Sequence, residues 1–176
     1  MENSRNIKVQ TDDMEAGCSA LAWETEDGKH LWGRNFDHSR IAEGSRVTYF
    51  PRKTEYTTWC RKPGNGERAQ SRYACVGTGF TEISSAPVLY EGINEKGLMG
   101  GQLYYRGFAR YSSETEAGEE MLQPPFAVLH LLAQCRTVNE AVRIIEKETT
   151  LVNTEISRHC TPLHWAFVIK PEKWRS

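Results

Sequence analysis

The stretch that decides the fold is Cys18-Ser-Ala-Leu-Ala-Trp-Glu-Thr-Glu-Asp-Gly-Lys-His-Leu-Trp-Gly-Arg-Asn-Phe-Asp37. It holds two apolar-rich runs, residues 18–25 and 30–36, joined by Glu26-Asp27-Gly28-Lys29. Asp-Gly between two such runs is a strong hairpin signal, because glycine tolerates the positive φ of a tight turn. The stretch therefore predicts a β-hairpin, whose antiparallel return brings Arg34 and Asp37 close to Cys18.

A thiol, a guanidinium and a carboxylate at one end of a hairpin suit nucleophilic catalysis. Cysteine attacks as its thiolate, and a neighbouring cation stabilises that form. Arg34 would supply the charge, while Asp37 would orient an amine or pair with Arg34. Hairpin geometry alone favours a plainer alternative, in which Cys18 is a small buried hydrophobe and the other two residues form a surface ion pair.

Four motifs follow one another in the sequence: Leu31-Trp-Gly-Arg-Asn-Phe-Asp37, Val47-Thr-Tyr-Phe-Pro-Arg52, Tyr90-Glu-Gly-Ile-Asn-Glu-Lys-Gly-Leu98 and Pro162-Leu-His-Trp165. Together they resemble the choloylglycine hydrolase family, which contains the bile salt hydrolases and the penicillin V acylases. The resemblance runs from Cys18 to about Trp165 and covers roughly the first half of a typical member.

This resemblance implies an N-terminal-nucleophile amidase with an α+β fold, the four-layer αββα sandwich. The part present would be the N-terminal half, an antiparallel sheet with one helical layer. The motif alignment makes Cys18 the nucleophile, supported by Arg34 and Asp37, with its own α-amino group as the general base. An α-amine suits that task because its unperturbed pKa is about eight. Residues 1–17 would be a leader removed by self-cleavage, and residues 18–176 a partial hydrolase domain.

The resemblance also implies an oxyanion position. Counting on from the Asn94-Glu-Lys-Gly97 motif places it at Tyr104, whose backbone N–H would help to hold the developing negative charge. Penicillin V acylases carry tyrosine there and bile salt hydrolases usually carry asparagine, so the expected substrate shifts towards acylase chemistry. As residues alone, Tyr104 and Tyr105 are also compatible with ordinary strand aromatics.

Composition narrows the classes of partner and location. With 22 basic and 23 acidic residues, the charge favours neither nucleic acid nor an anionic membrane. No apolar run approaches the roughly 18 residues of a membrane span. The polar leader lacks the apolar core of a signal peptide, which predicts a cytoplasmic protein. Five scattered cysteines and dispersed histidines predict no disulfide framework, no metal site and no cofactor, with Cys75 and Cys135 in the core.

The spacing of apolar residues and the positions of glycine and proline predict the remaining strands, loops and helices. Strands are expected over 46–50, 73–79, 98–105 and 163–169, a turn over 91–97, and long loops over 53–70 and 106–122. Residues 126–135 predict a buried helix, in which His130 is a core residue. Thr137-Val-Asn-Glu140 is a capping box and predicts a second helix, whose apolar stripe is Val138, Ala141, Val142 and Ile145.

After Trp165 the sequence departs from the family. The tail Lys170-Pro-Glu-Lys-Trp-Arg-Ser176 is polar, and neither the family's threonine-asparagine-proline motif, whose asparagine completes the oxyanion hole, nor its later arginine follows. We therefore expect a truncated chain or a shifted reading frame.

Three hypotheses for function remain open. The leading one is hydrolysis of small-molecule acyl amides through a Cys18 thioester. The second is a non-catalytic family remnant that folds or forms a homo-oligomer and binds acyl amides. The third is a papain-like hydrolase that pairs Cys18 with His38 or His164, although the local papain signature is absent.

Overall fold

The computed structural model describes residues 16–38, 44–58, 68–80, 86–105, 107–112, 119–152 and 162–169. Most of the predicted leader lies outside these ranges, as do Cys60 and Cys160 and parts of the two predicted loops.

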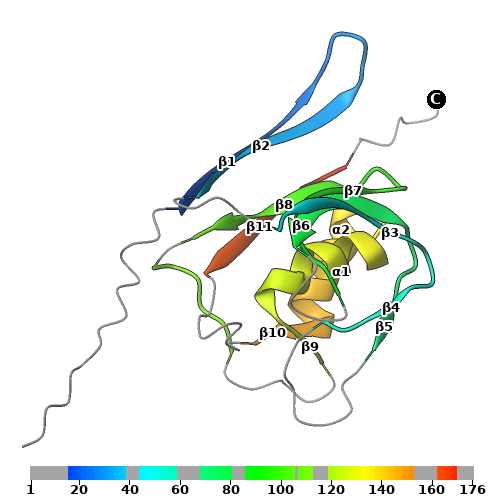
Figure 1. The fold of residues 1–176 in the computed structure, drawn as a ribbon, viewed down its shortest axis with the longest axis vertical. Coiled ribbons are helices and arrows are strands. Elements are labelled where there is room, and N and C mark those ends of the chain that lie inside the picture. The colour runs from blue at the N-terminus through cyan, green and yellow to red at the C-terminus, as the bar shows by residue number, and fades with distance from the viewer. Residues whose placement is uncertain are drawn as a thin grey trace, which may run out of the picture.

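A five-stranded antiparallel sheet forms the centre of the molecule, with the strand order β11-β8-β7-β6-β3 (Figure 1). Its strands are β3 (Arg46–Phe50), β6 (Cys75–Phe80), β7 (Val88–Asn94), β8 (Met99–Tyr104) and β11 (Leu163–Val168). The predicted strands over 46–50, 98–105 and 163–169 are thereby confirmed. Because β11 pairs with β8, it brings the C-terminal part of the described chain next to the middle of the sequence.

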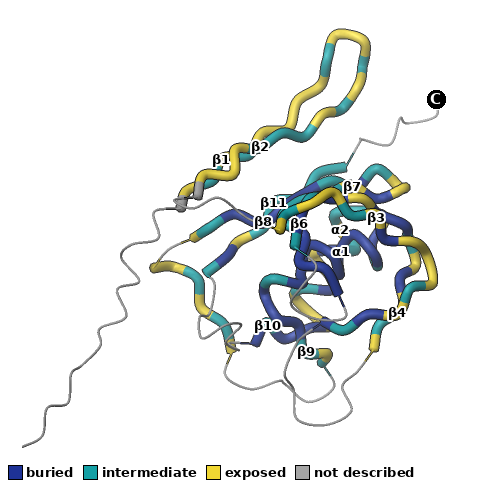
Figure 2. The backbone as a smooth tube through the Cα atoms, viewed as in Figure 1, coloured by how far each residue is buried: buried dark blue, intermediate teal, exposed yellow. Residues whose placement is uncertain are grey.

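Helices cover one face of this sheet. They comprise η2 (Pro124–Phe126), α1 (Ala127–Gln134), α2 (Val138–Arg143) and the π turn η3 (Ile144–Glu148). Nearly every residue of α1 is buried, so this predicted helix is confirmed, and the tube in Figure 2 is dark along it. The sheet accommodates the helix at Gly92, where a Cβ atom would come within 2.8 Å of Leu132 Cδ1. His130 is a buried core residue, as predicted.

Asn94 joins the sheet to the helical layer. Its Nδ2 donates to the carbonyl oxygens of Leu132 (2.8 Å) and Cys135 (2.6 Å) at the end of α1. Its Oδ1 accepts from the backbone N–H groups of Lys96 (3.0 Å) and Leu98 (3.1 Å) in the β7–β8 turn. One buried amide therefore satisfies four backbone groups, two at the end of α1 and two in the β7–β8 turn.

Several predicted boundaries were wrong. The turn expected over 91–97 is shorter, because β7 continues to Asn94 and pairs with β8. The loop over 53–70 contains two short paired strands, β4 (Glu55–Tyr56) and β5 (Ala69–Gln70). The loop over 106–122 ends in β9 (Glu120–Leu122), which pairs in parallel with β10 (Thr149–Leu151). In α2, Val142 is exposed and Ile144 is buried instead, because the chain widens into the π turn there.

A separate hairpin lies on the sheet face opposite the helices (Figure 1). It consists of β1 (Ala16–Glu24) and β2 (His30–His38), and Gly28 adopts φ 75° in its turn, as the sequence predicted. The hairpin packs against β8 but, in the described chain, forms its own two-stranded sheet. No part of it is coloured as buried in Figure 2, and its outer face exposes Leu21, Trp23 and Leu31.

The arrangement is the predicted α+β one: an antiparallel sheet with a helical layer on one face and the hairpin on the other. Among the described residues, no helix combines the length and the apolar character that a membrane span requires.

Candidate active site

Cys18 lies on β1, at the end of the hairpin away from its turn. Its backbone partner on β2 is Phe36, and its side chain is partly exposed. The other two described cysteines are buried, and burial raises the pKa of both Cys75 and Cys135 to about 12. Of the described thiols, Cys18 is therefore the one that solvent and substrate can reach. This placement argues against the plainer alternative of a buried, inert Cys18.

Arg34 directs its guanidinium at the Cys18 sulfur. The register pairs Arg34 with Ala20, so Arg34 and Cys18 share one face of the hairpin. Arg34 Nη2 lies 3.2 Å from Cys18 Sγ, within hydrogen-bonding distance for sulfur. Arg34 Nη1 donates to the carbonyl oxygens of Tyr90 (2.9 Å) and Gln102 (2.7 Å), which belong to adjacent sheet strands. The hairpin is thus fastened to the sheet through the same side chain that contacts the thiol.

Sequence reasoning did not identify the neighbours of Arg34 other than Cys18. Glu91 Oε2 lies 3.5 Å from Arg34 Nε, and the Arg34 side chain is only 2% exposed. Gly101 leaves room for the guanidinium, since a Cβ atom there would come within 3.3 Å of Arg34 Nη1. The Phe36 ring packs against Arg34, whose Cζ lies 4.9 Å from the ring centroid. Glu91 escaped notice because it falls where a turn was predicted.

Asp37 does not join this contact in the described structure. It pairs with Gly17, so its side chain is on the hairpin face opposite Cys18, and it is exposed. The strand period of two could have shown this from the sequence, because Arg34 and Asp37 are three residues apart. Asp37 nevertheless lies across from Gly17, beside the peptide bond that self-cleavage would break. Its expected role as an orienting group remains a prediction.

Tyr104 is the last residue of β8, the strand against which β1 packs, and its partner on β11 is Leu163. Among the described residues, no hydrogen bond joins Tyr104 to Cys18 or Arg34. Its role as oxyanion donor also remains a prediction.

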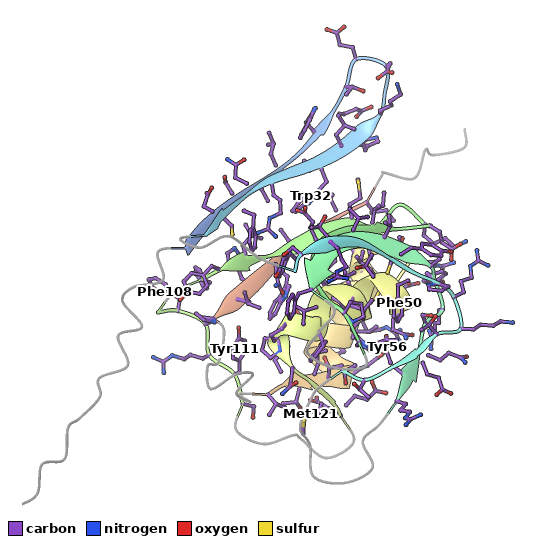
Figure 3. The ribbon with its side chains drawn as sticks, in the orientation of Figure 1. Trp32, Phe50, Tyr56, Phe108, Tyr111 and Met121 are labelled. Atoms are coloured by element: carbon purple, nitrogen blue, oxygen red, sulfur yellow. The ribbon has the colours of Figure 1, made fainter. Side chains whose placement is uncertain are left out.

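A groove of about 350 Å³ separates the hairpin from the sheet beside Arg34. Trp32 forms its hairpin wall (Figure 3), and Val47, Val76 and Ile93 form much of its sheet wall. Apolar walls next to a buried cation fit a ligand that combines an apolar group with a polar one.

Among the described residues, the hydrogen-bond partner of the Cys18 sulfur is Arg34, and no histidine bonds to it. His164 is exposed on β11 and packs edge-on against Tyr105, with ring centroids 4.8 Å apart. The His38 side chain lies outside the described part of the structure. Within the described ranges, no cluster of three or more His, Cys, Asp or Glu side chains could hold a metal ion.

Known proteins are similar to this chain in sequence and in fold. The family model described as linear amide C–N hydrolases, choloylglycine hydrolase family, matches residues 18–172, a match that begins at Cys18. The bile salt hydrolase/transferase of Clostridium perfringens is 31% identical over 150 residues, which are 84% of this chain and 44% of that protein. The bile salt hydrolase/transferase of Lactiplantibacillus plantarum is 32% identical over 157 residues, 88% of this chain and 45% of that protein.

The fold agrees with a solved structure. The crystal structure of a mutant conjugated bile acid hydrolase from Clostridium perfringens matches with a TM-score of 0.73 at 29% identity, covering 87% of this chain and 45% of that chain. The chain therefore spans somewhat less than half the length of the relatives it matches.

Proposed function

Since the chain belongs to the choloylglycine hydrolase family of linear amide C–N hydrolases, we propose that it provides the nucleophilic half of an acyl-amide hydrolase. The observation that carries the proposal is the contact between Arg34 Nη2 and the accessible Cys18 sulfur, at 3.2 Å. A buried guanidinium beside a sulfur favours the thiolate over the thiol, and the thiolate is the attacking species.

The first step would free the amine of Cys18. Its sulfur attacks the carbonyl carbon of Gly17, the C–N bond between the two residues breaks, and water hydrolyses the resulting thioester. Residues 1–17 leave as a carboxylic acid, and Cys18 keeps a free α-amino group. That the family match begins at Cys18 supports this boundary. Gly17 has no side chain to block the approach of the sulfur.

The amide reaction would then follow the same chemistry. The α-amine takes the thiol proton while sulfur attacks the substrate carbonyl, and it returns the proton to the departing amine. A thioester remains, which water hydrolyses to the free acid and the thiol. Asp37, across from Gly17, is suited to orient the new amine, and the backbone N–H of Tyr104 to hold the oxyanion.

The substrate class follows from the relatives and the groove. Bile salts and penicillin V both join an apolar acyl part to an amide, and the groove beside Arg34 has apolar walls for such a part. Tyr104 favours the acylase type of substrate, by its resemblance to that branch of the family.

Intact mass tests the proposal directly. The parent chain should lose residues 1–17 after purification, whereas Cys18→Ala should retain them. The processed parent should release free amine from phenoxyacetyl or glycocholate amides, and Cys18→Ala should release none. A parent that keeps residues 1–17 and hydrolyses no amide would contradict the proposal.

The second candidate is a family member that binds acyl amides without hydrolysing them. It is favoured by the position of the Asp37 side chain, which lies on the hairpin face opposite Cys18. Calorimetric binding of glycocholate without release of glycine would identify this candidate.

A further inference from the structure

We propose that Glu91 limits how strongly Arg34 stabilises the Cys18 thiolate, so that its charge acts on the nucleophile through Arg34. The inference rests on the proposed function only in taking Cys18 as the reacting group. Neither the sequence motifs nor the comparisons assign Glu91 a role.

The three nitrogens of Arg34 have three different kinds of partner. Nη2 faces the Cys18 sulfur at 3.2 Å, and Nη1 is held by the carbonyl oxygens of Tyr90 and Gln102. Nε faces the Glu91 carboxylate at 3.5 Å, a distance at which charge attraction operates without a hydrogen bond. The two carbonyl oxygens fix the guanidinium in place. The carboxylate therefore contributes charge more than orientation.

Burial makes that charge important. The Arg34 side chain is 2% exposed and has lost nearly all of its hydration, so it needs a nearby anion. While Cys18 is a thiol, Glu91 is the carboxylate that the described structure places within ion-pair distance of Arg34. When the thiol ionises, the sulfur becomes a second anion on the same cation. The two anions repel each other, so Glu91 reduces the net stabilisation of the thiolate.

The other described groups around Arg34 and Glu91 add no further charge to the guanidinium. Asp37, on the same strand as Arg34, is on the opposite face of the hairpin. The Phe36 ring packs on the guanidinium, and the Tyr90 ring stacks on Phe36 with centroids 4.8 Å apart. Tyr90 Oη lies 3.4 Å from Ser45 Oγ, so its hydroxyl is directed at a neutral partner.

Alkylation of Cys18 by iodoacetamide tests the inference without any need for amide hydrolysis. The background is Cys60→Ser with Cys160→Ser in the full chain, and peptide mapping by mass spectrometry locates the label. Rates are measured from pH 6 to 9 for the parent, Glu91→Gln and Glu91→Asp. We expect Glu91→Gln to react about fivefold faster near pH 7, after allowance for the screening of a partly exposed carboxylate. Its rate profile should move to lower pH, while Glu91→Asp, which keeps the charge, should stay near the parent.

A double-mutant cycle separates a charge effect from a structural one. In an Arg34→Gln background, Glu91→Gln should no longer accelerate alkylation, because the cation through which it acts is gone. Glu55→Gln is the matched control, since Glu55 pairs with Arg68 at 3.3 Å on the short β4–β5 sheet. It should leave the Cys18 rate unchanged.

Labelling of the buried Cys75 and Cys135 reports whether a variant is still folded. If Glu91→Gln exposes them, Glu91→Thr takes its place, since β-branched residues suit a strand. A folded neutral variant that reacts at the parent rate or more slowly would overturn the inference, as would an acceleration that persists without Arg34. Because the labelling does not depend on turnover, a chain that hydrolyses no amide can still confirm the role of Glu91.

Discussion

Replacing Asn94 with alanine should cost this protein a large part of its stability. Asn94 is 3% exposed, and its amide makes four hydrogen bonds to backbone groups of α1 and of the β7–β8 turn. Removing one partner leaves a buried backbone group unsatisfied, which costs about 1–3 kcal/mol where water cannot replace it. Lys96 is exposed, so its N–H can recover water, whereas Leu98 is fully buried and the carbonyls of Leu132 and Cys135 are under the sheet. We therefore expect a loss of about 3–5 kcal/mol.

Urea unfolding followed by circular dichroism measures this loss. Whole domains are stable by only about 5–15 kcal/mol. Asn94→Ala should therefore lower the urea concentration at the unfolding midpoint strongly, without a large change in the dependence of the unfolding free energy on urea concentration. Asn94→Asp should be at least as damaging, since it replaces the donor amide with a carboxylate that faces two carbonyl oxygens. A loss under about 1 kcal/mol for both variants would refute the reasoning.

Asn35→Ala provides the matched control. Asn35 is an asparagine on a strand, as Asn94 is, but its side chain is exposed on β2. Exposed substitutions of this kind usually change stability by less than about 0.5 kcal/mol. A comparable loss at both positions would mean that the four hydrogen bonds are not the cause.

Three further predictions concern packing and charge. Burial lowers the pKa of His130 to about 4, so this histidine takes up a proton at higher pH in the unfolded chain than in the folded one. The free energy of unfolding should therefore fall by about 2–3 kcal/mol as pH drops from 7 to 4.5. Over that pH range, the urea midpoint should fall less for His130→Gln than for the parent. An equal fall in both proteins would contradict this prediction. Gly92→Ala should lose about 1–3 kcal/mol in urea unfolding, because the added Cβ would come within 2.7 Å of the Val76 backbone oxygen and 2.8 Å of Leu132 Cδ1. An unchanged midpoint would contradict this. The chain should self-associate through its exposed apolar faces, and Leu21→Thr with Val47→Thr should weaken this association in sedimentation; an unchanged concentration dependence would exclude these faces.

The local features of the fold could be predicted from residue order. Asp27-Gly28 specified the hairpin turn because few residues other than glycine accept its φ of 75°. The apolar run after Pro125 specified a buried helix, and Thr137 caps the next one by accepting a hydrogen bond from Glu140 N–H at 3.2 Å. Each of these signals depends on a few neighbouring residues, so it can be recognised without knowledge of the rest of the chain.

The resemblance to the choloylglycine hydrolase family predicted the site more specifically than the hairpin pattern alone did. It singled out Cys18 and Arg34, which the structure brings to 3.2 Å of each other across two strands. It also grouped Asp37 with them, although the alternation of side chains along β2 places that carboxylate on the other face. Asp37 and Tyr104 therefore stay predictions for mutagenesis to settle.

By itself the sequence determined the hairpin, the helical layer and the family, because each depends on neighbouring residues or on a motif of fixed order. Only the tertiary structure decided what surrounds Arg34 and what Asn94 does. Arg34 reaches carbonyl groups 56 and 68 residues further along the chain, and Asn94 reaches carbonyls 38 and 41 residues away. Such partners are backbone atoms common to every residue type, so nothing in the order of side chains marks them before the strands and helices have packed.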